Sequence, residues 1–147
     1  MFNNLHIYLT YFIVERIYPD GSQYIDNLKG SKRYGIGTYL YTNGEKYQGE
    51  WFNDQTNGKG TSIFPNGNRY EGDEKNGKRH EYGVCYWANG EKYEGTWSND
   101  KMNGKGKYSW PEKNIQYEGS FKNDKKHGQG TLKYANGRIK QGIWEND

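Results

Sequence analysis

The chain has 147 residues and a net charge of only +3, and two residue types, Gly (21) and Tyr (15), dominate its composition. Leu, Ile, Val and Phe together supply 21 residues, too few for the core of an ordinary helical bundle. The low net charge and an aromatic content of 17% argue against a disordered chain. A folded core is therefore expected only if aromatic rings build it.

The first 16 residues match no other part of the chain, and we expect residues 1–16 to form an N-terminal capping segment. Their apolar residues lie at a helical spacing, but the β-branched and aromatic content fits a strand equally well. We favour a capping strand. The apolar run Leu5–Val14 is too short to cross a membrane. It also lacks the preceding basic residues of a signal peptide.

From residue 17 onward the sequence repeats. Tyr recurs at spacings of 23, 23, 23 and 24 residues, at Tyr24, Tyr47, Tyr70, Tyr93 and Tyr117. A period of this length is the signature of a repeat architecture. The predicted repeat domain, 17–147, consists of a partial repeat 17–23, the repeats 24–46, 47–69, 70–92, 93–116 and 117–139, and a partial repeat 140–147.

Each unit has the pattern of a β-hairpin. The segment Y-x-G-x-W alternates with period two, so its Tyr, Gly and Trp share one face of a strand. A second strand, G-x-G followed by alternating large residues, would follow a polar loop of about six residues, such as Lys75–His80. Asn-Gly then closes a turn that needs a positive φ. We expect the strand glycines to leave room for neighbouring rings.

A single unit cannot fold alone. Three rings bury about 150–250 Å² each, which stabilises the unit by less than the roughly 35 kcal/mol needed to order 23 residues. Neighbouring units must therefore supply the rest. We predict an all-β fold: an elongated, solenoid-like, twisted antiparallel sheet of stacked β-hairpin repeats of about 23 residues each.

The combination of Y-x-G-x-W, G-x-G, an aromatic residue and Asn-Gly at this period resembles the MORN (membrane occupation and recognition nexus) repeat family. The resemblance covers about residues 17–147. It implies a binding module, since in such proteins any chemistry lies in another domain. The third unit departs from the pattern, with Glu74 in place of Trp and Glu81 in place of Gly. We expect Glu74 either to turn outward or to pair with Lys75, Lys78 or Arg79.

Candidate catalytic groups are scarce. The segment Gly72–Lys78 has the glycine and lysine spacing of a phosphate loop, but Arg79 stands where the Mg²⁺-binding Ser or Thr belongs. His80 and His127 are two units, about 19 Å, apart, too far to share a metal. Cys85 is expected to be a small buried residue. We predict no enzyme activity, no catalytic or metal-binding residue and no cofactor.

The leading functional hypothesis is a non-enzymatic scaffold that binds a protein partner, as a helix or peptide, or a second copy of itself, through the aromatic face of the sheet. A single-layer sheet cannot hide every ring, and exposed rings often mark partner sites. The predicted partner-binding residues are Tyr39, Tyr41, Trp87, Tyr108, Trp110 and Tyr134.

The alternative is a peripheral membrane module, because residues 101–140 carry ten Lys and Arg against three Asp and Glu. Such a surface would attract acidic or phosphoinositide headgroups, with Lys125, Lys126 and Lys133 as lipid-binding residues. A third hypothesis is the regulatory repeat segment of a larger enzyme, since both ends stop within a repeat. Nucleic acid is not expected as a partner. We expect a cytoplasmic location, associated with the cytoskeleton or a membrane.

Overall fold

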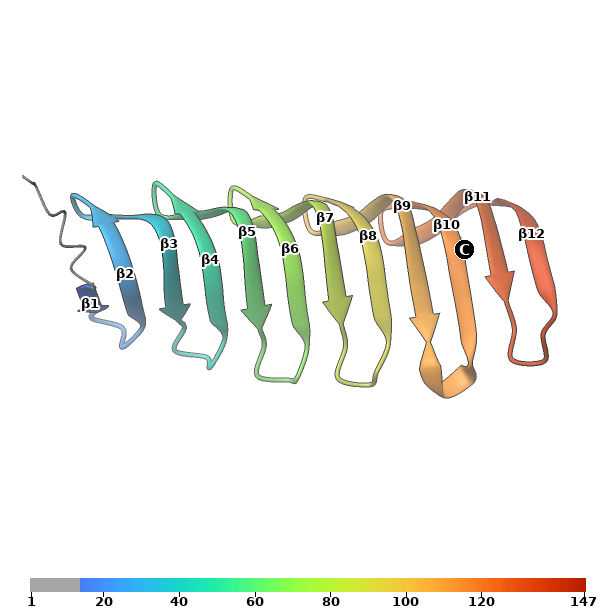
Figure 1. The fold of residues 1–147 in the computed structure, drawn as a ribbon, viewed down its shortest axis with the longest axis horizontal. Helices are drawn as coiled ribbons and strands as arrows, with labels where there is room; N and C mark the ends of the chain where they lie inside the picture. The colour runs from blue at the N-terminus through green and yellow to red at the C-terminus, as the bar shows by residue number, and fades with distance from the viewer. Residues whose placement is uncertain (1–13) are drawn as a thin grey trace, which may run out of the picture.

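Residues 14–147, the part of the chain that the computed structural model describes, form one antiparallel sheet of twelve strands that lie side by side in chain order (Figure 1). The strands are β1 (Val14–Ile17), β2 (Gln23–Lys29), β3 (Lys32–Leu40), β4 (Lys46–Phe52), β5 (Gln55–Ile63), β6 (Arg69–Lys75), β7 (Lys78–Tyr86), β8 (Lys92–Ser98), β9 (Lys101–Trp110), β10 (Ile115–Lys122), β11 (Lys125–Lys133) and β12 (Ile139–Trp144). Within these residues the one helical element is a short 3-10 turn, η1 (Pro111–Lys113). The predicted all-β sheet of stacked hairpins is confirmed.

The predicted capping segment falls mostly outside the described residues. Its last three residues, 14–16, belong to β1, which pairs with β2. From β2 to β11, each complete repeat is one hairpin, and every strand pairs only with its neighbours in the sequence. Among residues 14–147 no second sheet covers this one, so its two faces must differ in chemistry.

The core lies on one side of the sheet, which we call the ring face. Tyr47 is fully buried there, and its ring lies over Gly60 of the paired strand. A Cβ at Gly60 would stand 2.5 Å from Cζ of that ring, so only glycine fits. The same arrangement recurs in the pairs Tyr24/Gly37, Tyr70/Gly83, Tyr93/Gly106 and Tyr117/Gly130. The prediction that glycine makes room for rings is confirmed.

Where the fifth place holds a tryptophan, its side chain links the unit to the hairpin before it. The indole N–H of Trp51 donates to the carbonyl of Gly37, 3.1 Å away, and Trp97 does the same to Gly83. A β-bulge falls between the third and the fifth residue in each of the five complete hairpins, for example between Gly49 and Trp51, and in the first hairpin between Asp26 and Leu28. A bulge bends a strand and re-aims the next side chain, which here brings the ring over the preceding hairpin.

The two kinds of turn differ from the sequence prediction in one respect. The prediction of a polar loop of about six residues at 75–80 is wrong. Strands β6 and β7 are joined by the two residues Asn76 and Gly77, both with positive φ (52° and 75°). Such a two-residue turn matches the twist of the flanking strands. The predicted positive φ in the Asn-Gly turns is confirmed, at the glycine alone, with 86° at Gly44.

The repeat 93–116, which lacks Asn-Gly, forms its turn from a different structure. After Trp110 the chain makes the 3-10 turn η1, and Asn114 takes a left-handed conformation (φ 47°, ψ 46°). Asparagine is one of the few residues that tolerate this region. The N–H of Asn114 donates to the carbonyl of Pro111, which closes the turn before β10. The extra residue of this repeat is thus absorbed without a break in the sheet.

Candidate functional site

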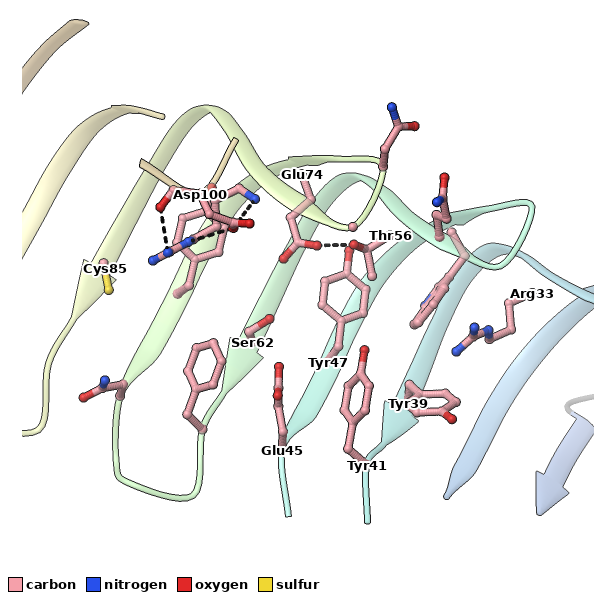
Figure 2. Close-up of a pocket in the computed structure, with 18 of the residues that line it drawn as sticks. Arg33, Tyr39, Tyr41, Glu45, Tyr47, Thr56, Ser62, Glu74, Cys85 and Asp100 are labelled. Atoms are coloured by element: carbon pink, nitrogen blue, oxygen red, sulfur yellow. Dashed lines mark hydrogen bonds and ion pairs between the residues drawn. The ribbon is translucent and has the colours of Figure 1, made fainter. Parts of the chain in front are cut away.

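A groove of about 660 Å³ runs across the ring face over β3 to β7, with Asp100 of the turn after β8 at its edge. Tyr41, Phe64 and Trp87 line it from the side of the Asn-Gly loops, and Arg33, Glu74 and Arg79 line it near the opposite ends of the strands. Figure 2 shows Tyr41 and Glu74 at these two ends. Its volume falls within the range of ligand-binding clefts. The groove combines ring edges with carboxylates and guanidinium groups, so it offers both apolar and charged contacts.

The aromatic residues predicted as a binding stripe all lie on the ring face or at its rim. Tyr39, Tyr41 and Trp87 line the groove, whereas Tyr108, Trp110 and Tyr134 lie beyond it, over β9 to β11. Tyr41 is the most open of the six, with 36% of its surface exposed, and the other five are half-buried. The stripe is therefore partly core and partly accessible surface.

Several rings of the stripe are held firmly in place. The rings of Tyr39 and Tyr41 are 4.5 Å apart, and those of Trp87 and Tyr108 stack at 5.1 Å. The hydroxyl of Tyr108 donates to Glu91, 2.6 Å away, while burial raises the pKa of this tyrosine. Rings fixed in this way lose little freedom when a partner binds, which favours binding.

Sequence reasoning missed part of the groove. Glu45, Thr56, Ser62 and Phe64 line it but were not among the predicted site residues. Phe64 occupies the same place in its repeat as Tyr41 and Trp87 do in theirs, so the period already contained a signal for it. The others have no such signal, because their positions differ in residue type from one repeat to the next.

Where one hairpin turn packs against the preceding hairpin, three positions meet; we call this meeting a repeat joint. The three positions are a residue at the start of a second strand, the fifth-place residue of the next unit, and the residue three places after it, which in a complete hairpin is the second residue of the turn. The five joints are Arg33/Trp51/Asp54, Thr56/Glu74/Gly77, Arg79/Trp97/Asp100, Met102/Phe121/Asp124 and Lys126/Trp144/Asp147. In each, the backbone N–H of the third residue donates to the carbonyl of the first residue.

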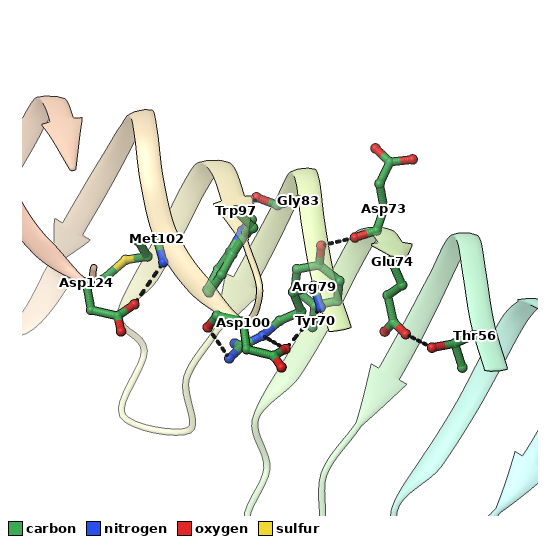
Figure 3. A network of polar contacts seen from close by, with 10 residues as sticks. All are labelled: Thr56, Tyr70, Asp73, Glu74, Arg79, Gly83, Trp97, Asp100, Met102 and Asp124. Carbon is green, nitrogen blue, oxygen red and sulfur yellow. Dashed lines mark hydrogen bonds and ion pairs between the residues drawn. The ribbon is translucent and has the colours of Figure 1, made fainter. Parts of the chain in front are cut away.

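Three joints contain a cation above a tryptophan. The guanidinium carbon of Arg79 lies 4.3 Å from the Trp97 ring centroid, and the same group donates from Nε to Asp100 over 3.2 Å (Figure 3). Arg33 repeats this geometry, also at 4.3 Å, over Trp51. Hydrogen bonds from Arg33, through its backbone N–H first and its side chain second, hold the pKa of Asp54 below its usual range.

The joint at Glu74 has a different chemistry. Glu74 is buried, with 9% of its surface exposed, and it accepts a hydrogen bond from the hydroxyl of Thr56 (Figures 2 and 3). Both sequence expectations are thus wrong: Glu74 does not turn outward, and it makes no ion pair with Lys75, Lys78 or Arg79 among the described residues. The reason is the bulge, which directs the fifth-place side chain inward whatever its type.

Two of the four carboxylates in the groove, those of Glu74 and Glu45, resist ionisation. Burial raises the pKa of Glu74, an effect that outweighs the Thr56 hydrogen bond, and burial also raises the pKa of Glu45. Figure 2 shows the two side chains reaching into the groove from opposite ends. Repulsion by the carboxylates of Asp100 and, to a smaller extent, Glu45 raises the pKa of Glu74 further. Neither carboxylate has a cationic partner in the part of the chain described.

The lysines predicted to bind lipid do not share one surface. Lys126 lies on the ring face, with Nζ 4.7 Å from the Trp144 ring centroid and 3.4 Å from Asp147. Lys133 is exposed and follows the buried Leu132, so it points from the opposite face. Lys125 is exposed at the other end of the same strand. The structure therefore distributes these three charges rather than gathering them.

The remaining candidates are a reactive thiol, a metal site and a membrane-spanning helix. Cys85 is buried in the wall of the groove, as expected, and burial raises the pKa of its thiol. Within residues 14–147, no three His, Cys, Asp or Glu side chains are placed to hold a metal ion. A helix long and apolar enough to cross a membrane is likewise not found in this range.

A sheet of stacked hairpins with ring-over-glycine packing defines a β-hairpin repeat protein. The family model of the MORN repeat matches residues 28–46, 47–69, 70–92, 93–115 and 117–137. The chain belongs to the MORN repeat family, and the resemblance seen in the sequence is confirmed. A comparison with curated proteins gave no match.

Three solved structures are distantly similar to this chain. The TCP domain of SAS-4 (dCPAP) of Drosophila melanogaster, in complex with a proline-rich motif of Ana2 (dSTIL), is 15% identical with a TM-score of 0.49 over 91% of this chain and 80% of that chain. The TCP10 domain of Danio rerio CPAP, in complex with a STIL peptide, is 10% identical with a TM-score of 0.24 over 88% and 83%. An inactive virginiamycin B lyase from Staphylococcus aureus with quinupristin is 10% identical with a TM-score of 0.24 over 88% and 54%. Similarity this low carries no functional argument.

Proposed function

We propose that this protein is a non-enzymatic interaction module that binds a peptide or helix of a partner protein through the ring face of its sheet. The observation that carries the proposal is the groove of about 660 Å³, walled by partly exposed rings that are already fixed by their neighbours. Tyr and Trp dominate the binding energy of protein interfaces. A preformed surface also keeps the ordering cost of binding low.

The membrane alternative has less support from the geometry. A headgroup site needs several cations on one accessible surface, whereas Lys126 is engaged with Trp144 and Asp147, and Lys133 points from the opposite face. Self-association through the same groove remains a variant of the proposal, in which the partner is a second copy of the chain.

Random 12-residue peptides displayed on phage, selected against the full chain, would test the proposal. Tyr41→Glu places a charge in the groove, and Tyr34→Glu is its matched control, because Tyr34 is equally exposed (37% against 36%) but packs against Phe52 on the opposite face. We expect Tyr41→Glu to weaken the selected peptides about tenfold or more, and Tyr34→Glu to change their affinity less than twofold. Circular dichroism checks the fold of both variants.

Failure to enrich any peptide, or equal effects of the two substitutions, would overturn the proposal. Vesicles of phosphatidylcholine and phosphatidylserine test the alternative. If the parent sediments with them at low salt and the triple change Lys125→Gln, Lys126→Gln and Lys133→Gln abolishes this, while Tyr41→Glu leaves peptide affinity intact, the basic surface is the site.

A further inference from the structure

The Glu74 joint differs from its neighbours at all three positions at once. Where the next joint has Arg79, Trp97 and Asp100, this one has Thr56, Glu74 and Gly77. The ring is replaced by a carboxylate, the cation by a hydroxyl, and the turn carboxylate by a glycine. The exchange removes the cation that three other joints supply from within the chain, and it leaves a space in the aromatic row.

The backbone of the joint is nevertheless intact. The N–H of Gly77 donates to the carbonyl of Thr56 over 3.0 Å, against 3.1 Å for the corresponding bond from Asp100 to Arg79. The bulge before Glu74 is also retained. The space at Glu74 is therefore a shaped part of an ordered sheet, and it opens into the groove.

The charge of the groove is unbalanced. Its charged lining consists of two arginines and four carboxylates, and Arg33 and Arg79 are already paired with Asp54 and Asp100. Glu45 and Glu74 are left without a cation among the described residues. A buried unpaired carboxylate is costly, and a cation that reaches it forms a strong, charge-assisted hydrogen bond.

The contacts at Glu74 leave room for such a bond. Thr56 donates to Oε2 of Glu74, so Oε1 retains its lone pairs. The rings of Tyr47 and Tyr70 are fully buried, so the lining rings whose faces are open to a cation are the more exposed ones of Tyr41 and Phe64. The protein already uses this chemistry one repeat further, where Arg79 lies over Trp97 and also 5.8 Å from the Tyr70 ring centroid.

We infer that the space at Glu74 is a subsite for a cationic side chain, lysine or arginine, of the peptide segment that occupies the groove. The incoming ammonium or guanidinium takes the place that Arg79 fills in the neighbouring joint, with its charge between Glu74 and Glu45 and its carbon stem against the rings. This inference rests on the proposed function, and it adds a selectivity that an apolar groove alone would not have.

The test uses the highest-affinity peptide from the phage selection. Its lysine is replaced by norleucine, or its arginine by citrulline, which keeps the shape and removes the charge. We expect selected peptides to share a lysine or arginine, and its replacement to weaken binding to the parent about tenfold or more. Because this change is made in the peptide, it does not depend on the folding of a protein variant.

Two protein variants locate the effect. Glu74→Gln keeps an acceptor for Thr56 and removes the charge, so the charged and neutral peptides should bind this variant with nearly equal affinity. Glu118→Gln is the matched control, because Glu118 is exposed on the opposite face next to the buried Tyr117. This control should keep the full preference for the charged peptide.

Each other outcome has a defined meaning. If Tyr41→Glu abolishes peptide binding but removal of the peptide charge, or Glu74→Gln, changes nothing, the subsite is overturned and the proposed function stands. Equal loss of preference in Glu74→Gln and Glu118→Gln would point to general attraction and would also overturn the subsite. If no peptide binds the groove, the proposed function and the subsite fail together.

Discussion

The joints at Glu74 and Trp97 lie one repeat apart and show how much this fold tolerates. Both keep the β-bulge and the turn-to-strand hydrogen bond, yet one buries an indole under a guanidinium and the other buries a carboxylate beside a hydroxyl. The backbone of each hairpin therefore does not require a ring at the fifth place. The rings add stability and line the groove, and the one missing at Glu74 leaves the space proposed above as a subsite.

The largest effect in this comparison should come from removing the ring of the regular joint. Trp97 is 4% exposed, so Trp97→Ala should lower the free energy of unfolding by about 3–5 kcal/mol. The matched change Lys101→Ala, at an exposed position, should stay within about 0.5 kcal/mol. Urea denaturation followed by fluorescence measures both, and equal midpoints would contradict the assignment of faces.

The ring-over-glycine packing allows a second, smaller test. Gly106→Ala places a Cβ 2.5 Å from Cε2 of the buried Tyr93 ring, so we expect a loss of about 1–3 kcal/mol from overpacking. Gly142→Ala is the control, because a Cβ there meets nothing within 4 Å. This substitution should be neutral or slightly stabilising in thermal unfolding. A loss as large as that of Gly106→Ala would show that the ring contact is not what restricts these positions to glycine.

The irregular joint can also be converted into a regular one. Glu74→Trp removes a buried carboxylate and fills the space, so it should stabilise the fold by about 0.5–2 kcal/mol. Adding Thr56→Arg should contribute a further gain of about 0.5–1 kcal/mol, because the guanidinium then lies over the new indole. A double-mutant cycle from chemical denaturation measures the coupling. A loss of stability on Glu74→Trp would contradict the register of this joint.

The smallest effect should appear in the pH dependence of stability. Burial raises the pKa of Glu74, so between its unfolded value near 4.5 and its folded value the native state binds more protons than the unfolded state. The free energy of unfolding of the parent should therefore fall, relative to Glu74→Gln, as the pH rises from 4.5 through the folded pKa. Above that pKa the difference should be constant. Parallel curves for the two proteins would show that this carboxyl titrates normally.

Much of the site could be predicted because the same position carries an aromatic residue in successive repeats. Tyr41 and Trp87 were identified from their shared place in the unit, and Phe64 follows from the same rule. The sequence shows Glu74 as a departure from the repeat pattern, but the partners predicted for its side chain are wrong. Thr56 lies 18 residues away in another hairpin, and nothing in the local sequence links the two. Only the lateral register of neighbouring hairpins brings them together.

The sequence by itself determined the family, the hairpin repeat and the face on which the rings lie. These depend on local rules, namely the period of two along a strand, the positive φ that Asn and Gly tolerate, and the fit of a ring over a residue without a side chain. The tertiary structure decided the two-residue turns, the bulge before the fifth residue and the meeting of three residues at each joint. Those features depend on how adjacent strands pair, and a difference of one residue in register sends a side chain to the other face.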